Sequence, residues 1–234
     1  MANLISRRSA EHLFFFGIAL LLLGYLLVGF WQSYITAGFV LAPLPSLLVH
    51  IHAVLFVGWI SLFGVQIGLV GTSRVAAHRK LGAFMGWWAA AMVVIGPATV
   101  VMAVRRPDSG LGAAVLAGDL AQTLAFVALI SVGLARRRNA LAHKRLMTLG
   151  SAAIIGPALA RWPFDFIQSG PPIGIAFFYL LPSLLLIAYD LAALRRVHRA
   201  TCFGFGSMVL VLASFLGIPA LHGWQVFTSW IRAV

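Results

Sequence analysis

Two histidines stand one residue apart in the apolar stretch LLVHIHAVLF, at residues 47–56. His50 and His52 lie about 200° apart around an ideal helix, so a straight helix cannot offer both imidazoles to one ion. Ionisable groups at membrane depth are rare and usually face the protein interior or a cavity. Each histidine is therefore either a ligand of a metal ion or heme, or a neutral side chain hydrogen-bonded at a helix interface.

A second pair of histidines comes from a repeated motif. The segment AAHRKLGAFMG at 76–86 resembles LAHKRLMTLGS at 141–151, and His78 and His143 occupy the same place in the two copies. Each lies near a helix N-terminus, where the helix dipole disfavours imidazolium. Two neutral histidines from different helices at one depth are what axial ligation of a heme needs. The alternative is that HRK and HKR only anchor their helices at the lipid headgroups.

One acidic residue is predicted to lie deep in an apolar span. Asp119 is about 12 Å along a helix that begins near residue 111. A carboxylate at that depth needs a cation or several hydrogen-bond donors to stay ionised. Asp119 is therefore a candidate metal ligand together with His50 and His52, a proton relay, or a structural hydrogen-bond partner. Four more polar residues could belong to these sites: Gln66, Gln122, Arg161 and His222.

The composition requires that helices in a membrane position these residues. Apolar residues make up 62% of the chain and charged residues 9%, and mean hydropathy is +0.99, so the partner is a lipid bilayer. The net charge of +12 does not indicate a nucleic-acid partner, because the basic residues cluster between apolar spans. We predict an all-α, polytopic transmembrane helical bundle in a single domain, 1–234, with about seven helices at 13–31, 47–70, 81–104, 111–135, 146–162, 173–194 and 203–221.

The basic residues also predict the orientation. With the N-terminus in the cytoplasm, thirteen Lys and Arg residues fall on the inner side and four on the outer side. IGPA recurs at 95–98 and 155–158, so we expect spans two and three to be a parallel repeat of spans four and five, with a Gly-Pro break in each copy. Near the inner surface, we expect Asp190 to pair with Arg195 and Arg196.

Several of these motifs occur together elsewhere. HIHAVLFVGWISLFGVQ, VAAHRKLG, GDLAQ and AHKRLM…GPALARWPFD resemble the signature of a broad group of uncharacterised bacterial multipass membrane proteins, which reads roughly H-x-H, HRxLG and HKRLM. HKRLM is also similar to membrane assembly factors of heme–copper oxidases. The first resemblance covers residues 47–165 and the second 143–150. They imply a multi-pass protein of the bacterial inner membrane whose candidate cofactor ligands are His50, His52, His78 and His143.

Three classes of function remain open. The first is a protein that binds heme or copper in redox chemistry or respiratory-complex assembly. The second is a proton-coupled small-molecule transporter, and the third is a non-catalytic subunit of a larger membrane complex or homo-oligomer. A zinc hydrolase of the ceramidase type is disfavoured, because the last span is followed by only His222 and has no HxxxH pair. The sequence does not decide whether the protein is an enzyme, nor whether the histidines form one site or two.

Overall fold

The computed structural model describes residues 2–41, 46–106, 112–170 and 172–233, with only the backbone described for 2–8 and 37–41. The described chain is helical and contains no strand, so the prediction of an all-α bundle is confirmed. Six helical segments in the described parts are long and apolar enough to cross a membrane: Ser9–Thr36, Leu47–Gly71, Val75–Arg105, Ala113–Ala135, Ile173–Leu194 and Arg199–Ala220. The protein is therefore built as a multi-pass membrane protein.

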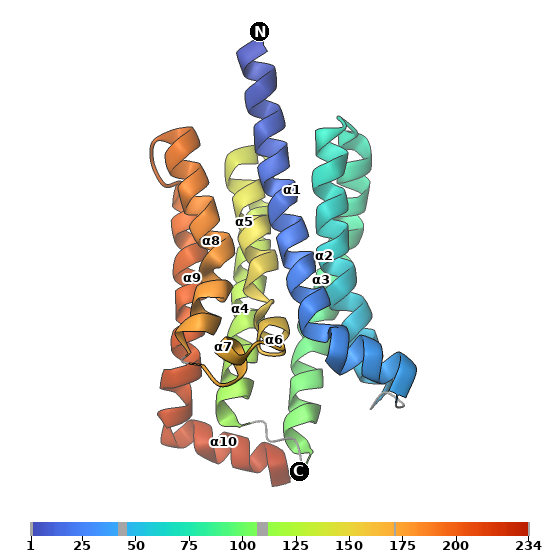
Figure 1. Ribbon diagram of the computed structural model, residues 1–234, viewed down its shortest axis with the longest axis vertical. Helices are drawn as coiled ribbons and strands as arrows, with labels where there is room; N and C mark the ends of the chain where they lie inside the picture. The colour runs from blue at the N-terminus through green and yellow to red at the C-terminus, as the bar shows by residue number, and fades with distance from the viewer. Residues whose placement is uncertain (1, 42–45, 107–111, 171, 234) are drawn as a thin grey trace.

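Figure 1 shows how these segments are arranged. The elements are α1 (Ala2–Phe30) with a π-helical continuation η1 (Trp31–Leu41), α2 (Leu47–Gly71), α3 (Val75–Arg105), α4 (Ala113–Ala135), α5 (Ala140–Ala153), α6 (Gly156–Leu159), α7 (Asp165–Gln168), α8 (Ile173–Leu194), α9 (Arg199–Gly217) with a 3₁₀ turn η2 (Ile218–Ala220), and α10 (His222–Ala233). The chain crosses the bundle a seventh time through α5, α6 and α7, which lie in the sequence between the fourth and fifth of the six long segments (Figure 1).

This seventh crossing corrects the prediction of one continuous span at 146–162. Helix α5 begins at Ala140 and ends at Ala153, and α6 follows with only four residues. Pro157 has no N–H to bond the carbonyl of Ala153, and its ring would clash with that carbonyl in a continuous helix. The hydroxyl of Tyr179 on α8 donates to the Ala153 carbonyl instead, at 2.8 Å. The break is thus stabilised by a neighbouring helix, as unpaired backbone in a membrane requires.

The matching break predicted in the first repeat is wrong. Helix α3 runs without interruption through Gly96 and Pro97 to Arg105. Its flank is exposed at the bundle surface, where Val94 keeps 67% of its accessible area. A break on such a flank would leave backbone groups facing lipid with no protein side chain to bond them. The same four residues therefore interrupt one helix and not the other because their surroundings differ.

The predicted repeat itself is seen in the first turns of α3 and α5. The His78 N–H donates to the Arg74 carbonyl at 3.0 Å, and the His143 N–H donates to the Asn139 carbonyl at 2.9 Å. Each histidine is thus the fourth residue after the residue that caps its helix. Helices α2 and α4 run in one direction and α3 and α5 in the other (Figure 1), which is compatible with the predicted parallel repeat.

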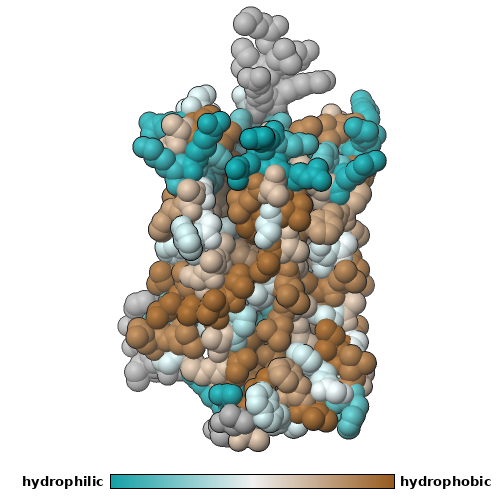
Figure 2. Space-filling view, turned by 180° about the vertical axis from the view of Figure 1, so that it is seen from behind, coloured by the Kyte–Doolittle hydropathy of each residue, from teal (hydrophilic) through white to brown (hydrophobic). Residues whose placement is uncertain are grey.

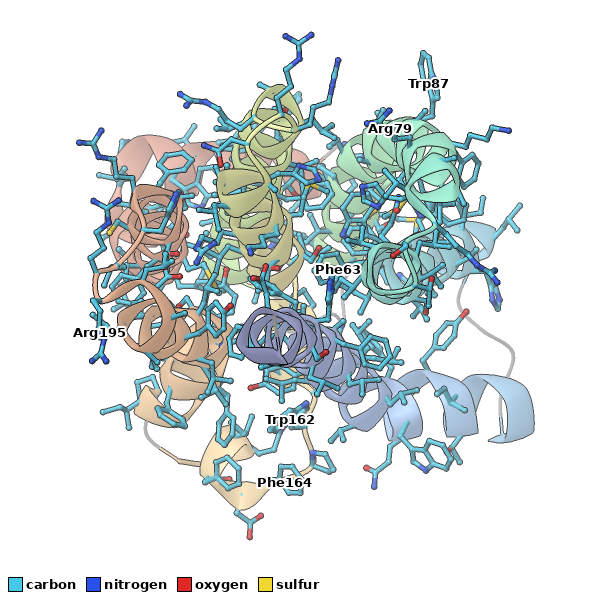
Figure 3. The ribbon with its side chains drawn as sticks, turned by 90° about the horizontal axis from the view of Figure 1, so that it is seen from above. Phe63, Arg79, Trp87, Trp162, Phe164 and Arg195 are labelled. Carbon is cyan, nitrogen blue, oxygen red and sulfur yellow. The ribbon has the colours of Figure 1, made fainter. Side chains whose placement is uncertain are left out.

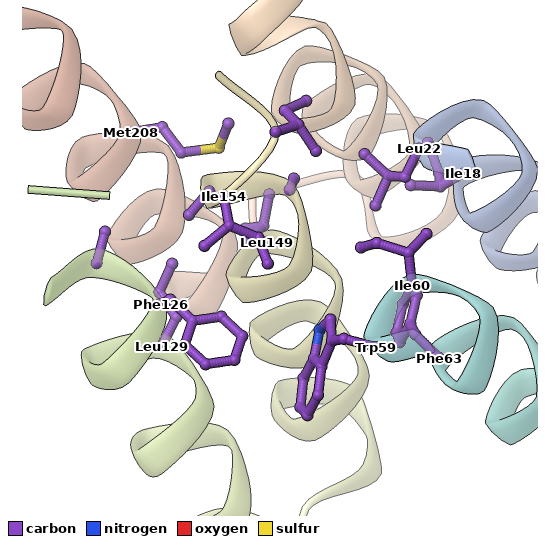
Figure 4. Packing of buried hydrophobic residues seen from close by; sticks show 14 of the residues in the cluster. Ile18, Leu22, Trp59, Ile60, Phe63, Phe126, Leu129, Leu149, Ile154 and Met208 are labelled. Carbon is purple, nitrogen blue, oxygen red and sulfur yellow. The ribbon is translucent and has the colours of Figure 1, made fainter. Parts of the chain in front are cut away.

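The core lies around α5, between α1, α2, α4 and α9. Trp59 is 1% exposed and packs its ring edge-to-face against Phe126, while its Nε1–H donates to the Ser151 hydroxyl at 3.0 Å (Figure 4). Leu149 of α5 and Met208 of α9 are fully buried in the same cluster. Figure 2 shows hydrophilic residues gathered at the end that carries the N-terminus and an apolar belt beside it. This matches the charge asymmetry that predicts a cytoplasmic N-terminus.

Helix α1 approaches α6 so closely that only glycine fits at residue 29. A Cβ added at Gly29 would lie 2.1 Å from the carbonyl oxygen of Ala158, which is backbone and cannot rotate away. We expect Gly29→Ala to destabilise the protein by about 1–3 kcal/mol, as overpacking does, and to lower its thermal unfolding midpoint in detergent. Gly24→Ala on the same helix is the matched control, because nothing lies within 4 Å of its Cβ. Equal midpoints for the two variants would contradict this packing.

Candidate functional site

The structure brings His78 and His143 together at the end of the bundle that carries the N-terminus. Their ring centroids are 6.4 Å apart and their planes are nearly perpendicular, at 89°. One ring comes from the first turn of α3 and the other from the first turn of α5. The sequence repeat predicted this pair at one depth, and the geometry agrees.

The proton on His143 is fixed by a backbone carbonyl. Its Nδ1 lies 2.8 Å from the carbonyl oxygen of Gly133, on α4. A carbonyl only accepts hydrogen bonds, so Nδ1 carries the proton and Nε2 of the neutral ring keeps its lone pair. Metal-ligating histidines are oriented in this way, by a carbonyl or carboxylate on the nitrogen that does not bind the metal.

His78 lies beside Gln66 of the preceding helix, and each of the two side chains has a buried polar atom without a hydrogen-bond partner among the described residues. Its ring interacts with the backbone of Gln66 on α2. The Nδ1 of His78 and the Oε1 of Gln66 are both buried, and neither has a hydrogen-bond partner among the described residues. The Gln66 amide donates instead to the sulfur of Met85, at 3.4 Å. Buried polar atoms normally have a partner, so these two unpaired atoms are features to be explained.

The tripeptide HKR of α5 is an internal anchor. His143, Lys144 and Arg145 point about 100° apart and so face three directions. Lys144 pairs with Glu11 of α1, and Arg145 pairs with Asp190 of α8. Headgroup anchoring is therefore wrong for HKR. In the other repeat Arg79 and Lys80 are exposed at the surface, where that interpretation fits (Figure 3 labels Arg79).

Asp190 has a different partner from the one predicted. Arg195 and Arg196 are exposed, while Arg145 donates from Nε to Oδ1 of Asp190 at 2.9 Å with both side chains fully buried. The other oxygen, Oδ2, accepts from the His198 N–H at 2.9 Å and from the Thr201 hydroxyl at 2.6 Å. Arg195 turns the chain with left-handed backbone (φ 59°), and α9 then covers Asp190. This network fixes α5, and with it His143, against α8 and α9.

The histidines of α2 have separate partners, as their spacing predicts. The Nδ1 of His50 lies 3.0 Å from the hydroxyl of Tyr34, on η1. His52 stacks on Phe56 with centroids 4.2 Å apart, and its Nδ1 is buried without a partner in the described chain. His52 precedes Gln66 by fourteen residues, about 21 Å along an ideal helix. His50 and His52 therefore belong to a different site from His78 and His143.

Asp119 belongs to the helix break. Its Oδ1 accepts from the Gln122 amide at 3.0 Å, and the Gln122 Oε1 accepts from the Gly156 N–H at 3.0 Å. The charge of Arg161 acts on both Asp119 and His52. No group of three or more His, Cys, Asp or Glu is placed to hold a metal ion within the residues that the structure describes. His50, His52 and Asp119 are thus not brought together into one such group.

The remaining predicted residues, Arg161 and His222, lie apart from His78 and His143. Arg161 donates from Nη1 to the Pro157 carbonyl at 2.6 Å and places its guanidinium over the ring of Phe30, at 5.2 Å. His222 is exposed at the first residue of α10 and joins neither histidine pair. Tyr179 was missed by the sequence reasoning, although a tyrosine inside the apolar span 173–194 is a signal that could have found it.

Comparisons with known protein families, with curated proteins and with solved structures found no match to this chain. The function is therefore inferred from the chemistry of two regions, the pair His78 and His143 and the helix break beside Asp119.

Proposed function

We propose that the protein binds a heme or a transition-metal ion through His78 and His143, and acts in redox chemistry or in the assembly of a respiratory complex. The observation that carries the proposal is the close, perpendicular pair of imidazoles, with centroids 6.4 Å apart. The carbonyl on Nδ1 of His143 leaves Nε2 free to bind. On the other ring, Nδ1 of His78 is a buried nitrogen without a hydrogen-bond partner among the described residues.

The separation of the rings suits one metal centre between them. Metal–imidazole bonds are about 2 Å long, so two imidazoles on opposite sides of one metal have centroids about 6 Å apart. The separation of 6.4 Å between His78 and His143 is close to that value. Perpendicular ring planes are compatible with such a centre, because each ring can rotate about its own metal–nitrogen bond.

The number of ligands favours heme over zinc. Structural zinc takes four protein ligands and catalytic zinc takes three. The described residues bring no third His, Cys, Asp or Glu to His78 and His143. Heme iron has four nitrogens from the porphyrin and needs only axial ligands from the protein. Copper(I) is the second choice, because it prefers thioether and thiolate ligands. Met85 lies about 10 Å along α3 from His78 and is too far to act as such a ligand beside the two histidines.

Basic residues at the same end suit the carboxylates of a heme. Arg79 and Lys80 are exposed in the first turns of α3, and Arg136, Arg137 and Arg138 are exposed directly after α4. Arginine binds carboxylates through paired hydrogen bonds that add both strength and orientation. Propionates directed toward the surface would therefore have partners on both repeats.

The first test is an ultraviolet–visible spectrum of purified protein, oxidised and dithionite-reduced, with elemental analysis of the same sample. We expect a reducible Soret band and about one iron per chain. Copper at about one per chain in a colourless sample would support the copper form of the proposal. A colourless sample without either metal, obtained after cofactor supplementation during expression, would contradict it.

The helix break favours a second candidate, a proton-coupled transporter. Discontinuous helices at the interface of two repeats form substrate and ion sites in many transporters. Here the break between α5 and α6 is joined to Asp119 through Gln122.

For this candidate we expect Asp119→Asn to abolish proton entry into proteoliposomes, followed with an entrapped pH-sensitive dye under an applied potential. Asp165→Asn is the matched control, because Asp165 is exposed at the start of α7. Equal proton entry in wild type and the Asp119 variant would exclude a proton path through Asp119.

A further inference from the structure

Helix α10 lies across the end of the bundle opposite the N-terminus (Figure 1). The twelve residues His222–Ala233 follow η2 after a sharp turn and are too short to cross a membrane. The last predicted span ends at residue 221, so the sequence predicted no helix in this stretch.

Helix α10 is fixed to the ends of α3 and α4. The indole N–H of Trp224 donates to the Ala113 carbonyl at 3.0 Å, and Arg105 donates from Nε to the Ile231 carbonyl at 3.1 Å. Ile231 is 3% exposed and packs in a small buried cluster with Val104. The helix therefore holds one position and does not swing freely.

The two sides of α10 that do not face the bundle differ in chemistry. At 100° per residue, three apolar residues lie on one side and three polar residues on the other. The apolar edge consists of Val226, Phe227 and Trp230, which keep 54%, 39% and 57% of their accessible areas. The polar edge consists of the exposed residues Gln225, Ser229 and Arg232. This amphipathic pattern with aromatic residues is typical of helices that lie in a membrane interface.

We propose that α10 lies in the plane of the membrane interface and inserts its apolar edge into the lipid leaflet at this end of the bundle. Tryptophan and phenylalanine on such an edge suit the boundary between headgroups and acyl chains. Helix α10 is bonded to the end of α3 through Arg105, and the flank of α3 is itself apolar and exposed at Val94. Three side chains are too few for a protein partner, since a stable interface buries about 800 Å² on each side.

This placement marks the membrane boundary at the start of α4. Trp224 contacts Ala113, the first residue of that helix. Asp119 lies six residues further, about 9 Å inward along the helix. With α10 in the interface, Asp119 and its partner Gln122 lie below the headgroups, within the hydrocarbon region, whichever function the histidines serve.

The test uses spin labels on the two edges of α10. In a Cys202→Ser background, which removes the one cysteine of the chain, Trp230→Cys and Ser229→Cys are labelled with a nitroxide and the protein is placed in phospholipid vesicles. We expect the label at 230 to collide more with oxygen, which concentrates in lipid, than with a water-soluble nickel chelate, and the label at 229 to show the reverse. Val226→Cys repeats the test on the apolar edge if the tryptophan variant does not fold.

Two results would overturn the proposal. One is equal access of the nickel chelate to labels on both edges, which would place α10 in water. The other is spin–spin broadening at residues 226 and 230 that disappears on dilution with unlabelled protein, which would assign the edge to a second copy of the chain. A label at 230 that favours oxygen without such broadening supports insertion into lipid.

Discussion

Replacing His143 by alanine is expected to remove the bound cofactor while leaving the bundle folded. The side chain is half-buried, and its Nδ1 bonds only a carbonyl of α4 within the described chain. The free Nε2 is the proposed ligand, so its loss removes one of two axial positions. We expect heme or metal per chain to fall at least about tenfold, the lower range for disturbing even the outer partners of a metal site. The measurement is Soret absorbance and metal content per chain, at equal protein yield.

His78→Ala is expected to give the same loss, because the proposed centre takes one ligand from each of the two rings. His222→Ala is the matched control, since His222 is exposed on α10 at the far end of the bundle. The variants His50→Ala and His52→Ala should retain the cofactor. If His143→Ala kept the cofactor and His52→Ala lost it, the site would lie at His50 and His52. That result would contradict the assignment to His78 and His143.

Asp190→Ala is expected to produce the largest loss of stability in the molecule. The carboxylate and Arg145 are both fully buried, and the carboxylate also accepts from His198 and Thr201. Its removal leaves an uncompensated guanidinium in the protein interior. Breaking one half of a buried pair costs about 3–5 kcal/mol. The measurement is the thermal unfolding midpoint in detergent, which should fall sharply.

Two comparisons show whether the buried charge is the cause. Glu11→Gln removes the partner of Lys144 in a pair whose side chains are 22% and 35% exposed, so its effect should be about 1 kcal/mol or less. The double variant Arg145→Leu with Asp190→Leu should be more stable than Asp190→Ala, because it leaves no unpaired charge. If Asp190→Ala were no more harmful than Glu11→Gln, the network would not be what holds α5 to α8.

The sequence predicted the helical bundle because long apolar runs in a membrane have one solution for their backbone hydrogen bonds. It failed where the same local sequence has two outcomes. IGPA interrupts the chain at Pro157, where Gln122 and Tyr179 bond the freed backbone groups, and leaves α3 continuous at Pro97. Those partners lie on other helices, so no local pattern could have distinguished the two copies.

For the candidate site, the sequence predicted which two histidines lie together but not the groups that bond them. The repeat placed His78 and His143 at one depth without any knowledge of the fold. It could not provide their partners, because the carbonyl of Gly133 is chemically identical to any other carbonyl in the chain. Likewise, Asp190 is 45 residues from Arg145 and only five from Arg195, and proximity in sequence favoured the wrong partner. Long-range polar pairs of this kind depend on how helices pack, which charge patterns alone do not encode.

The electron paramagnetic resonance spectrum of the oxidised, purified protein tests metal binding by His78 and His143 most directly. We expect low-spin ferric iron with two nitrogen axial ligands, and the perpendicular rings predict a strongly anisotropic signal. The signal should be lost in His143→Ala. A high-spin iron signal, or a sample that contains neither iron nor copper, would contradict the claim that His78 and His143 hold one metal centre between them.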